Sequence, residues 1–461
     1  MMNVDLLVKD GRVVMPGQGV YKMDVAIHKG KIAALLNPGR SIAADQVLDA
    51  KDKLVLPGGV DAHTHLTMGP GEIGYETETR SAAVGGITTT LSYLLDAEDP
   101  EKSVKREILA GEKRACGDFG LHPAVVTDEQ IQALDQTAKH FGVPSFKFFM
   151  IFRGEEGVYL NIPGNDDGFL FKLFRKVASL PGVIPCVHAE NIELIWSLRP
   201  EVQQDGDGGL GDWDRSRPDF AEAEAIQRAL YLAEKAGSPL YVVHVTCREA
   251  LEVIKQARAR RPGRVFAETC PHYLVLTCEN GPFPAGKVNP PLRHSDDVEA
   301  LWGGIEDGTI DVVGSDHVPR RMDTKNGGIW KASAGFPGVA TMLPVFLTEG
   351  IRRGLPLEQL VKKISAAPAE IFGLAPAKGT LLPGSDGDLT LIDPETESTI
   401  SSSTLASDSD YTPFEGMTVR CMPTHTVLRG NVVVEDGRYV GRPGVGSYIP
   451  RKVDYQEERS L

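Results

Sequence analysis

One apolar run ends in two histidines that stand two residues apart: Leu54-Val55-Leu56-Pro57-Gly58-Gly59-Val60-Asp61-Ala62-His63-Thr64-His65. The apolar residues predict a buried strand. Residues i and i+2 of a strand point to the same face, so His63 and His65 would present their ring nitrogens side by side. Such a pair offers two ligands to a metal ion. A complete metal site needs further ligands from later parts of the chain.

The composition is that of a globular protein with an acidic surface. Hydrophobic residues make up 41% and charged residues 24% of the 461 residues, enough chain for a large core and an accessory domain. The net charge is −14, from 49 Lys and Arg against 63 Asp and Glu. Such a charge argues against nucleic acid or an anionic membrane as a partner.

The six cysteines are scattered, without a Cys-x-x-Cys pair, at positions 116, 186, 247, 270, 278 and 421. We expect reduced thiols in a cytoplasmic protein, without a disulfide framework or a zinc knuckle. The N-terminal residues lack the basic-then-apolar pattern of a signal peptide, and no apolar run reaches the length of a membrane span. We therefore expect no membrane partner.

The two ends of the chain resemble each other. Residues 5–14 and 427–438 are short alternating strands broken by Asp-Gly or Gly-Asn turns, which are typical of hairpins. We expect residues 1–56 and 376–445 to pair as one small antiparallel domain, a β-sandwich built from both ends. The polar residues 446–461 are predicted to form a tail that extends over the surface or a neighbouring subunit.

The middle of the chain, residues 57–375, alternates between strand-like and helix-like segments. Helix-like segments such as 101–115, 222–236 and 248–260 separate most of the strand-like runs. Those apolar, β-rich runs start near Val60, Ile87, Gly120, Phe146, Val183, Leu240, Val265 and Ile310. Eight strands alternating with helices predict an α/β fold of the (β/α)8 TIM-barrel type. An open doubly wound sheet is the alternative.

Further side chains of ligating type stand at the ends of the later strands: Lys147, His188, His244 and Asp316. In a barrel the C-terminal strand ends meet around one site, so distant residues converge there. Each position alone has a structural explanation, such as a hydrogen-bonded histidine, a snorkelling lysine or a turn-forming aspartate. Their joint placement with His63 and His65 favours a metal centre.

Several motifs together resemble the cyclic amidohydrolases of the amidohydrolase superfamily, which include hydantoinase, dihydropyrimidinase, allantoinase and dihydroorotase. The resemblance covers nearly the whole chain, including the split terminal domain. Its motifs are Pro57-Gly58-Gly59-Val60-Asp61-Ala62-His63-Thr64-His65-Leu66, Ser145-Phe146-Lys147-Phe148-Phe149-Met150, His188-Ala189-Glu190-Asn191, Glu268-Thr269-Cys270-Pro271-His272-Tyr273-Leu274 and Gly314-Ser315-Asp316-His317.

The resemblance implies a centre of two divalent metal ions. In that family a lysine is carboxylated by CO2, and its carbamate bridges the ions; here this would be Lys147, as N6-carboxylysine. The family pattern assigns His63, His65 and Asp316 to the first ion, and His188 and His244 to the second. Nitrogen and oxygen ligands without thiolate suit zinc, with manganese or cobalt as alternatives.

The chemistry implied is hydrolytic opening of a cyclic amide. Two cations that share a water lower its pKa from 15.7 to about 7, so hydroxide is present at neutral pH. The hydroxide would attack the ring carbonyl, and Asp316 would act as the catalytic residue that moves a proton to the leaving nitrogen. The expected substrate is a small molecule such as a hydantoin, a dihydropyrimidine or a cyclic imide.

The substrate pocket departs from each subgroup of the family. Phe152 stands where hydantoinases and dihydropyrimidinases carry a tyrosine, and Thr67 stands where dihydroorotases carry an arginine. Asn289, before Pro290-Pro291, is closer to dihydroorotases. We expect Phe152, Asn289 and Gly335 to contact the substrate, with ordinary loop packing as the alternative.

Two other functions stay open. One is an allantoinase or dihydroorotase-like ureide hydrolase, although the arginine missing at Thr67 weighs against dihydroorotase. The other is a non-catalytic scaffold, since some relatives of this fold assemble without catalysis; those usually lack metal ligands, whereas all the expected positions are filled here. The resemblance also implies a homo-oligomer, a tetramer or a dimer.

Overall fold

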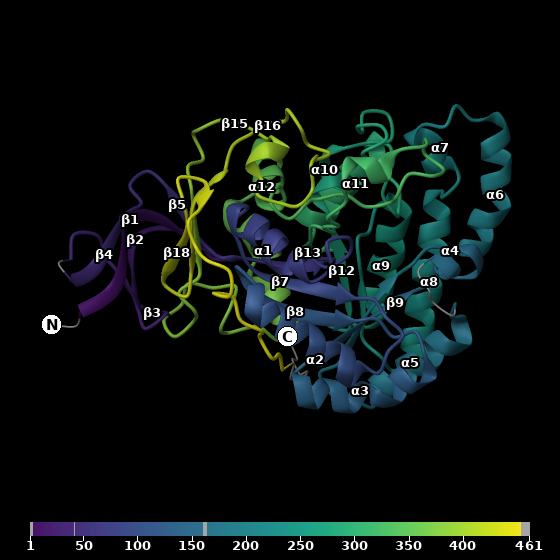
Figure 1. The fold of residues 1–461 in the computed structure, drawn as a ribbon, viewed down its shortest axis with the longest axis horizontal. Coiled ribbons are helices and arrows are strands. Elements are labelled where there is room, and N and C mark those ends of the chain that lie inside the picture. Colours follow the sequence, from purple (N-terminus) through teal and green to yellow (C-terminus); the bar gives the residue numbers. More distant parts are fainter. Residues whose placement is uncertain (1–2, 41, 160–163, 453–461) are drawn as a thin grey trace.

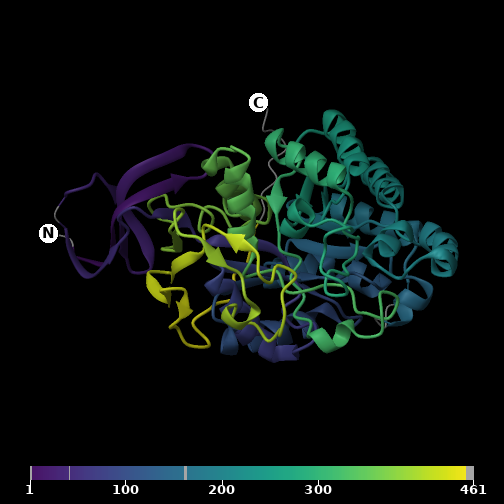
Figure 2. The same cartoon turned by 90° about the horizontal axis from the view of Figure 1, so that it is seen from above.

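The computed structural model describes residues 3–40, 42–159 and 164–452, without the side chains of Glu155 and Tyr159. Both views show a small sheet beside a larger body of helices and strands (Figures 1 and 2). The small sheet contains both the first and the last described strands, which are the purple and yellow ribbons of Figure 1. The larger body carries the candidate site.

The strands of the larger body form two parallel sheets. The first contains β6 (Gly59–Thr64), β7 (Ile87–Leu94) and β8 (Asp118–Pro123) in that order. The second contains β9 (Ser145–Phe149), β10 (Ile184–His188), β11 (Leu240–Val242), β12 (Val265–Thr269) and β13 (Val312–Val313) in that order. The parallel order follows the chain, as expected for strands joined by crossover helices.

The two parallel sheets are joined at both of their edges. Parallel bridges link Ala124 to Lys147 on one side and Thr64 to His317 on the other. Side chains from both sheets also pack in one buried apolar cluster, which includes Val60, Leu91, Tyr93, Ile184, Cys186, Tyr241, Val243 and Val312. Phe372, just beyond helix α14 (Ala366–Ile371), belongs to the same cluster. The two sheets therefore enclose a common interior.

Helices follow most of the parallel strands. They are α1 (Gly74–Val84), α2 (Pro100–Arg114), α3 (Asp128–Phe141), α4 (Gly154–Tyr159), α5 (Asp167–Ala178), α6 (Ile192–Asp205), α7 (Leu210–Arg215), α8 (Asp219–Ala236), α9 (Arg248–Arg260), α10 (Pro271–Val275), α11 (Ser295–Glu306), α12 (Met342–Arg352), α13 (Leu357–Lys363) and α14. Single 3-10 turns occupy Gly71–Ile73, Met322–Lys325 and Ser402–Thr404. Helices α2, α8 and α9 confirm the three predicted helical segments to within a few residues.

The small sheet joins the two ends of the chain. Its N-terminal strands are β1 (Asn3–Met15), β2 (Gly19–His28), β3 (Lys31–Leu36), β4 (Ala43–Asp49) and β5 (Leu54–Pro57). Its C-terminal strands are β14 (Leu389–Ile392), β17 (Pro423–Leu428), β18 (Asn431–Glu435) and β19 (Arg438–Tyr439). Strand β5 pairs with β14, so the ends are hydrogen-bonded to each other. Strands β15 (Ser398–Thr399) and β16 (Thr418–Val419) form a separate pair.

The prediction of a small antiparallel domain was wrong in one respect. Strand β1 pairs with β2 in the antiparallel sense but with β4 and β5 in the parallel sense. The hairpin turns that supported the prediction report only on strands that are adjacent in sequence. The parallel partners reach β1 through longer connections, which leave no turn signature.

The start of the predicted tail packs inside the molecule instead of over its surface. Ile449 N donates to the carbonyl of Phe119, and Arg451 N donates to the carbonyl of Gly142. The Arg451 side chain is buried, and its Nη1 donates to Oγ of Ser145 over 2.9 Å. The prediction was wrong here because the Ser145 hydroxyl and the Leu121 carbonyl accept from the two terminal nitrogens of this arginine inside the molecule. Residues 453–461 of the predicted tail lie outside the described residues.

Two further features bear on the environment of the chain. No helix within the described ranges is long and apolar enough to cross a membrane. All six cysteines are buried with free thiols. Burial raises the pKa of Cys186 to about 12, so this thiol stays protonated beside the candidate site.

Candidate metal centre

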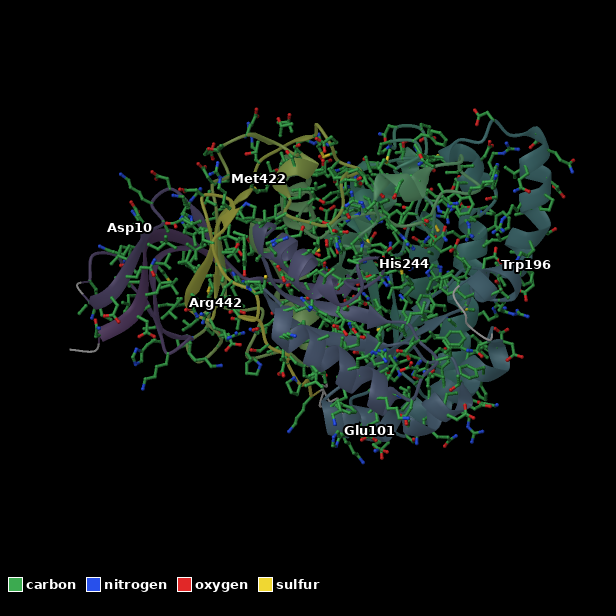
Figure 3. The ribbon with its side chains drawn as sticks, viewed as in Figure 1. Asp10, Glu101, Trp196, His244, Met422 and Arg442 are labelled. Atoms are coloured by element: carbon green, nitrogen blue, oxygen red, sulfur yellow. The ribbon has the colours of Figure 1, made fainter. Side chains whose placement is uncertain are left out.

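The residues expected to bind metal lie at or just beyond the carboxyl ends of the parallel strands, except Lys147, which is the middle residue of β9. His63 lies in β6, Lys147 in β9, and His188 ends β10, while His244 and Asp316 follow β11 and β13. All six predicted ligands are more than nine-tenths buried, with exposed fractions between 0% for His63 and 8% for His65. Figure 3 places His244 inside the larger body.

A first group of ligand atoms gathers around Asp316. Its Oδ1 lies 3.0 Å from Nε2 of His63 and 3.4 Å from Nε2 of His65. Ligand atoms about 2.1 Å from one tetrahedral ion lie about 3.4 Å apart, so these separations suit a shared metal. Nε2 of His63 is buried and makes no hydrogen bond to any described residue. The group therefore fits an ion that the three side chains would share.

Glu268 determines which nitrogen of His63 is bare. Its Oε1 lies 2.6 Å from Nδ1 of His63, and its Oε2 accepts from the Tyr241 hydroxyl over 2.8 Å. With the Nδ1 proton donated to Glu268, Nε2 carries the lone pair that faces Asp316. Nε2 of His63 and Oδ1 of Asp316, both acceptors, then face each other. A cation bound between them would remove the repulsion between their lone pairs. Glu268 lies in one of the family motifs, but its contact with His63 could not be inferred from the sequence.

A second group joins His188 and His244. Nδ1 of His188 lies 2.9 Å from Nε2 of His244, while Nε2 of His188 lies 2.8 Å from Oε2 of Glu190. Glu190 is buried and is paired with Arg217 over 3.1 Å. A carboxylate on the outer nitrogen leaves the inner nitrogen of His188 free for a metal. Glu190 and Arg217 are a second pair whose role sequence reasoning missed.

Lys147 lies close to the first group, since its Nζ is 4.2 Å from the centre of the Tyr93 ring, which is itself 4.6 Å from the His63 ring. Within the described ranges, no carboxylate forms an ion pair with this lysine, which is only 1% exposed. Burial lowers the pKa of Lys147 to about 8. The neutral amine is thus accessible near neutral pH, and only the neutral amine reacts with CO2.

The electrostatics of the site favour the forms that bind metal. Burial lowers the pKa of His65 to about 4 and also lowers the pKa of His188, so both rings are neutral. Burial favours the neutral acid at Asp316, yet His63 and His65 hold the pKa of its carboxyl well below the usual range. His63 is the exception: burial opposes its charged form, but the carboxylates of Glu268 and Asp316 raise its pKa. A metal ion bound at Nε2 would replace the proton that these carboxylates attract.

The backbone at two predicted ligands is strained. His244 has φ 39° and Asp316 has φ 48°, in the left-handed region that residues other than glycine rarely adopt. Such residues cost about 1–3 kcal/mol each and cluster at functional sites. Gly314 is required nearby, since a Cβ there would lie 2.9 Å from Oε2 of Glu268.

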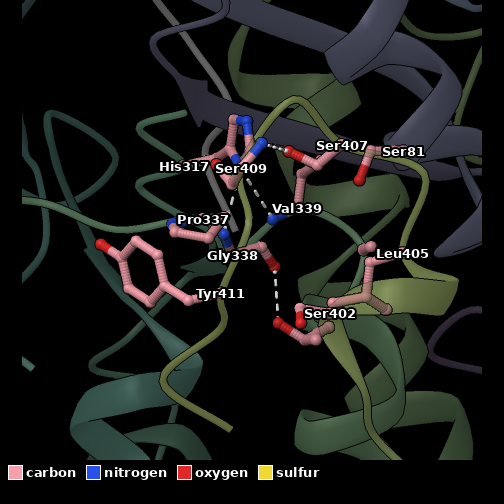
Figure 4. Close-up of a pocket in the computed structure, with 12 residues that line it drawn as sticks. Ser81, His317, Pro337, Gly338, Val339, Ser402, Leu405, Ser407, Ser409 and Tyr411 are labelled. Carbon is pink, nitrogen blue, oxygen red and sulfur yellow. Dashed lines mark hydrogen bonds between the residues drawn. The ribbon is translucent and has the colours of Figure 1, made fainter. Parts of the chain in front are cut away.

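His317, next to Asp316, anchors a neighbouring loop. Its Nε2 lies 3.0 Å from Oε2 of Glu78, and both side chains are fully buried. Its Nδ1 accepts from the backbone N–H of Gly338 over 3.1 Å and of Val339 over 3.4 Å, as Figure 4 shows. The segment that follows Gly335 is thereby fixed to the strand end that carries Asp316.

The predicted substrate contacts differ in their surroundings. Phe152 stacks on His188 with ring centres 6.3 Å apart, which places it beside the second ligand group. Asn289 accepts with Oδ1 from Trp213 Nε1 over 3.1 Å, and Gly335 has φ +90°. Among the described residues neither Asn289 nor Gly335 is hydrogen-bonded to a predicted ligand.

Two other groups contain side chains of ligating type: Asp118, Asp386 and Asp388, and Asp214, Cys278 and His294. The first group surrounds Nζ of Lys378, which forms ion pairs with all three carboxylates. In the second, Sγ of Cys278 lies 3.5 Å from one ring nitrogen of His294 and 3.9 Å from the other. The Cys278 thiol thus faces the His294 ring and not one of its lone pairs. The first group already binds the Lys378 ammonium, so neither group has the geometry of the site around Asp316.

Comparison with known proteins identifies one protein family and several relatives of this chain. The model of the amidohydrolase family matches residues 221–433. The chain is 35% identical to a D-hydantoinase from Geobacillus stearothermophilus, over 96% of each chain. It is 34% identical to an allantoinase from Escherichia coli (strain K12 / DH10B), over 96% of this chain and 98% of that one. An L-hydantoinase (dihydropyrimidinase) from Arthrobacter aurescens superposes with a TM-score of 0.90 at 33% identity, over 97% of this chain and 100% of that one.

Proposed function

Because the chain belongs to the amidohydrolase family, we propose that it is a metal-dependent hydrolase that opens the ring of a cyclic amide. The convergence of His63, His65 and Asp316 on one buried point is the observation that carries this proposal. The hydantoinase relatives support a hydantoin, a dihydropyrimidine or a cyclic imide as the substrate. The filled ligand positions argue against a non-catalytic scaffold.

The fold proposed with this function is a closed (β/α)8 barrel over residues 57–375. The bridges at both sheet edges and the shared interior cluster support closure. Residues 1–56 and 376–445 would form the β-sandwich, in which strands from both ends bury one apolar cluster. Residues 446–461 would be a separate C-terminal segment. The site then lies at the carboxyl ends of the barrel strands, where such folds hold their active sites.

The metal centre proposed here would hold two divalent ions, zinc in the first place and manganese or cobalt as alternatives. His63, His65 and Asp316 would hold one, His188 and His244 the other, and carboxylated Lys147 both. When bound, the ions would act as Lewis acids that polarise the substrate carbonyl and lower the pKa of water. Carboxylation of Lys147 would convert an unpaired buried amine into an anionic oxygen ligand.

The protein's own side chains would orient the reactants and move the proton. The attacking water adds its oxygen to the ring carbonyl carbon, and the carbon–nitrogen bond of the ring breaks. Asp316, kept ionised by His63 and His65, would take the proton of the water and deliver it to the leaving nitrogen. Glu268 and Glu190 would hold the His63 and His188 rings in their binding orientation.

The proposed substrate contacts are Phe152, Asn289 and Gly335. Phe152 offers an apolar face beside His188 and has no hydrogen-bond donor. Oδ1 of Asn289 already accepts from Trp213, so its Nδ2 and backbone are left for the substrate. This environment favours an apolar ring substituent or a cyclic imide.

Ring opening of allantoin is the second candidate function. The allantoinase relative covers the same share of this chain as the D-hydantoinase relative, at nearly the same identity. Allantoin carries the same cyclic amide chemistry with a polar ureido substituent. The two candidates therefore differ in the pocket and not in the metal centre.

A hydrolysis panel tests both candidates. The zinc-loaded protein would be assayed with bicarbonate against hydantoin, dihydrouracil, succinimide, allantoin and dihydroorotate. We expect ring opening of hydantoin, dihydrouracil or succinimide; hydrolysis of allantoin alone would favour the second candidate. A metal-loaded protein that opens none of the five rings would refute the proposal. Light scattering on the same sample tests the proposed dimer or tetramer.

A further inference from the structure

Two buried lysines lie next to the segments that carry the proposed substrate contacts. Lys287 is 4% exposed and Lys325 is 0% exposed. In the part of the chain that the structure describes, neither lysine forms an ion pair with a carboxylate. A buried cation without an ionic partner is costly, so its other contacts must compensate for the lost water.

Among the residues that the structure describes, Lys325 donates only to main-chain carbonyls. Its Nζ lies 3.2 Å from the carbonyl oxygen of Lys287, 2.8 Å from that of Ser333 and 2.6 Å from that of Gly335. An ammonium group has three donors, and all of them find an acceptor here. The acceptors come from two segments that are distant in sequence, so the lysine ties these segments together.

Lys287 makes the reciprocal connection. Its Nζ donates to the carbonyl of Ala332 over 2.6 Å and lies 3.9 Å from the centre of a Trp213 ring. The N–H of Gly335 donates to the carbonyl of Lys287 over 3.0 Å. Trp213 in turn donates to the carbonyl of Val288 over 3.0 Å. Both lysines thus bind the segment 332–335: Lys287 through Ala332, and Lys325 through Ser333 and Gly335.

Residues 336–338, which follow the acceptors of Lys325, are also hydrogen-bonded to the residues next to Asp316. Val318 N donates to the carbonyl of Phe336 over 3.0 Å, and Gly338 N donates to His317. Among the described residues neither lysine is hydrogen-bonded to a predicted metal ligand. The lysines therefore contact segments that are hydrogen-bonded to the residues beside Asp316, and not the predicted ligands themselves.

We propose that Lys325, with Lys287, is a positioning residue that holds segments 287–289 and 333–338 in the geometry needed to bind the substrate. The role rests on the proposed function, in which Asn289 and Gly335 face the cyclic amide. Loss of the ammonium would leave the buried carbonyls of Ser333 and Gly335 without this donor. The two segments would then be joined less firmly, through the remaining bonds such as that from Gly335 N to the Lys287 carbonyl. Substrate binding would weaken while the metal centre stayed intact.

The test compares Lys325→Met with a control, Lys378→Met, on the zinc-loaded enzyme. Lys378 is equally buried, at 2% exposed, but its ion pairs lie with Asp118, Asp386 and Asp388. With the best substrate of the panel, we expect Lys325→Met to raise KM at least tenfold, with a smaller change in kcat and unchanged metal content. Lys378→Met should lower the Tm and leave KM within twofold. An unchanged KM in Lys325→Met, or metal loss in step with the rise in KM, would overturn the proposal.

Hydrogen–deuterium exchange tests, without substrate, whether the lysines hold segments 287–289 and 333–338 together. Lys325→Gln keeps two neutral donors and is the variant to use if Lys325→Met does not fold. We expect at least tenfold faster exchange in 285–291 and 332–338, with β9 to β11 unchanged; equal exchange in these segments would overturn the proposal. If the protein opens no ring but shows this exchange pattern, the proposed function is refuted, whereas the connection of the two segments by the lysines is supported.

Discussion

At the candidate metal centre, each ligand group contains a histidine whose outer ring nitrogen contacts a glutamate carboxylate. Glu268 contacts Nδ1 of His63, and Glu190 contacts Nε2 of His188. The carboxylate fixes the proton on the outer nitrogen and leaves the inner nitrogen as a stronger ligand. The two glutamates thus shape the site without facing the proposed ions.

Glu268→Gln should weaken metal binding. The amide cannot accept the His63 proton as strongly, so we expect the affinity for zinc to fall about 10–100-fold. Competition with a chromophoric chelator measures this change. Glu222→Gln is the control, because Glu222 is as buried but contacts Arg293 and Thr246. Equal zinc affinity in Glu268→Gln and the unsubstituted protein would contradict the assigned role.

Carboxylation of Lys147 should depend on pH. The lone pair of neutral Nζ attacks the carbon of CO2, a nitrogen–carbon bond forms, and a proton is released. Since the pKa of Lys147 lies at about 8, the neutral fraction rises as pH increases through that value. Between pH 7 and pH 9, at fixed dissolved CO2, the initial rate on metal-free protein should rise about tenfold. Carbon-13 NMR with labelled CO2 measures the carbamate; a rate independent of pH would contradict this account.

The sequence predicted side chains with a chemical signature and missed those defined by contacts. His63 and His65 could be found because strand periodicity pairs them. The contact between His63 and Glu268 spans 205 positions, and no local pattern encodes it. Lys325 was missed for another reason: its acceptors are main-chain carbonyls, which every residue possesses.

At the scale of elements, helix α14 helps to close the interior between the parallel sheets. Phe372, directly after this helix, is fully buried and packs edge-on against His122 and Tyr241. Backbone contact with β6 continues through Val60 N, which donates to the carbonyl of Ile364. The interior that supports Lys147 thus depends on this helix.

Phe372→Ala should destabilise the protein by about 3–5 kcal/mol, because it removes a buried ring and leaves a cavity. Urea denaturation followed by fluorescence measures the change. Phe220→Ala on α8 is the matched control, since Phe220 is 46% exposed and its loss should cost less than about 0.5 kcal/mol. Equal midpoints for the two variants would show that Phe372 does not close the interior.

Three helices were predicted well from their local sequence, whereas helix α3 was not named among the predicted segments. Its signals are a capping box between Thr127 and Gln130 and Gly142 in the left-handed conformation at its end. Helices α2, α8 and α9 lie close to their predicted segments. The parallel pairing of β1 with β4 and β5 could not be predicted, because long connections carry no register information.

For the whole molecule, the chain ends are structural parts of the body that carries the site. Lys378 and Arg429 form ion pairs with Asp118 at the start of β8. Arg451 is buried in the larger body, although residues 446–461 were predicted to extend over the surface. Composition gave no sign of this, since an arginine is buried only where tertiary structure supplies its acceptors.

The central claim is that Lys147 completes a two-metal centre that opens a cyclic amide. The most direct measurement is zinc content and ring-opening rate, side by side, for the unsubstituted protein and Lys147→Ala loaded in bicarbonate. The account predicts two zinc ions per chain and turnover of a panel substrate, with Lys147→Ala losing at least one ion and at least 99% of the rate, which corresponds to about 2.7 kcal/mol or more of transition-state stabilisation. Full zinc content with near-normal turnover in Lys147→Ala would contradict it.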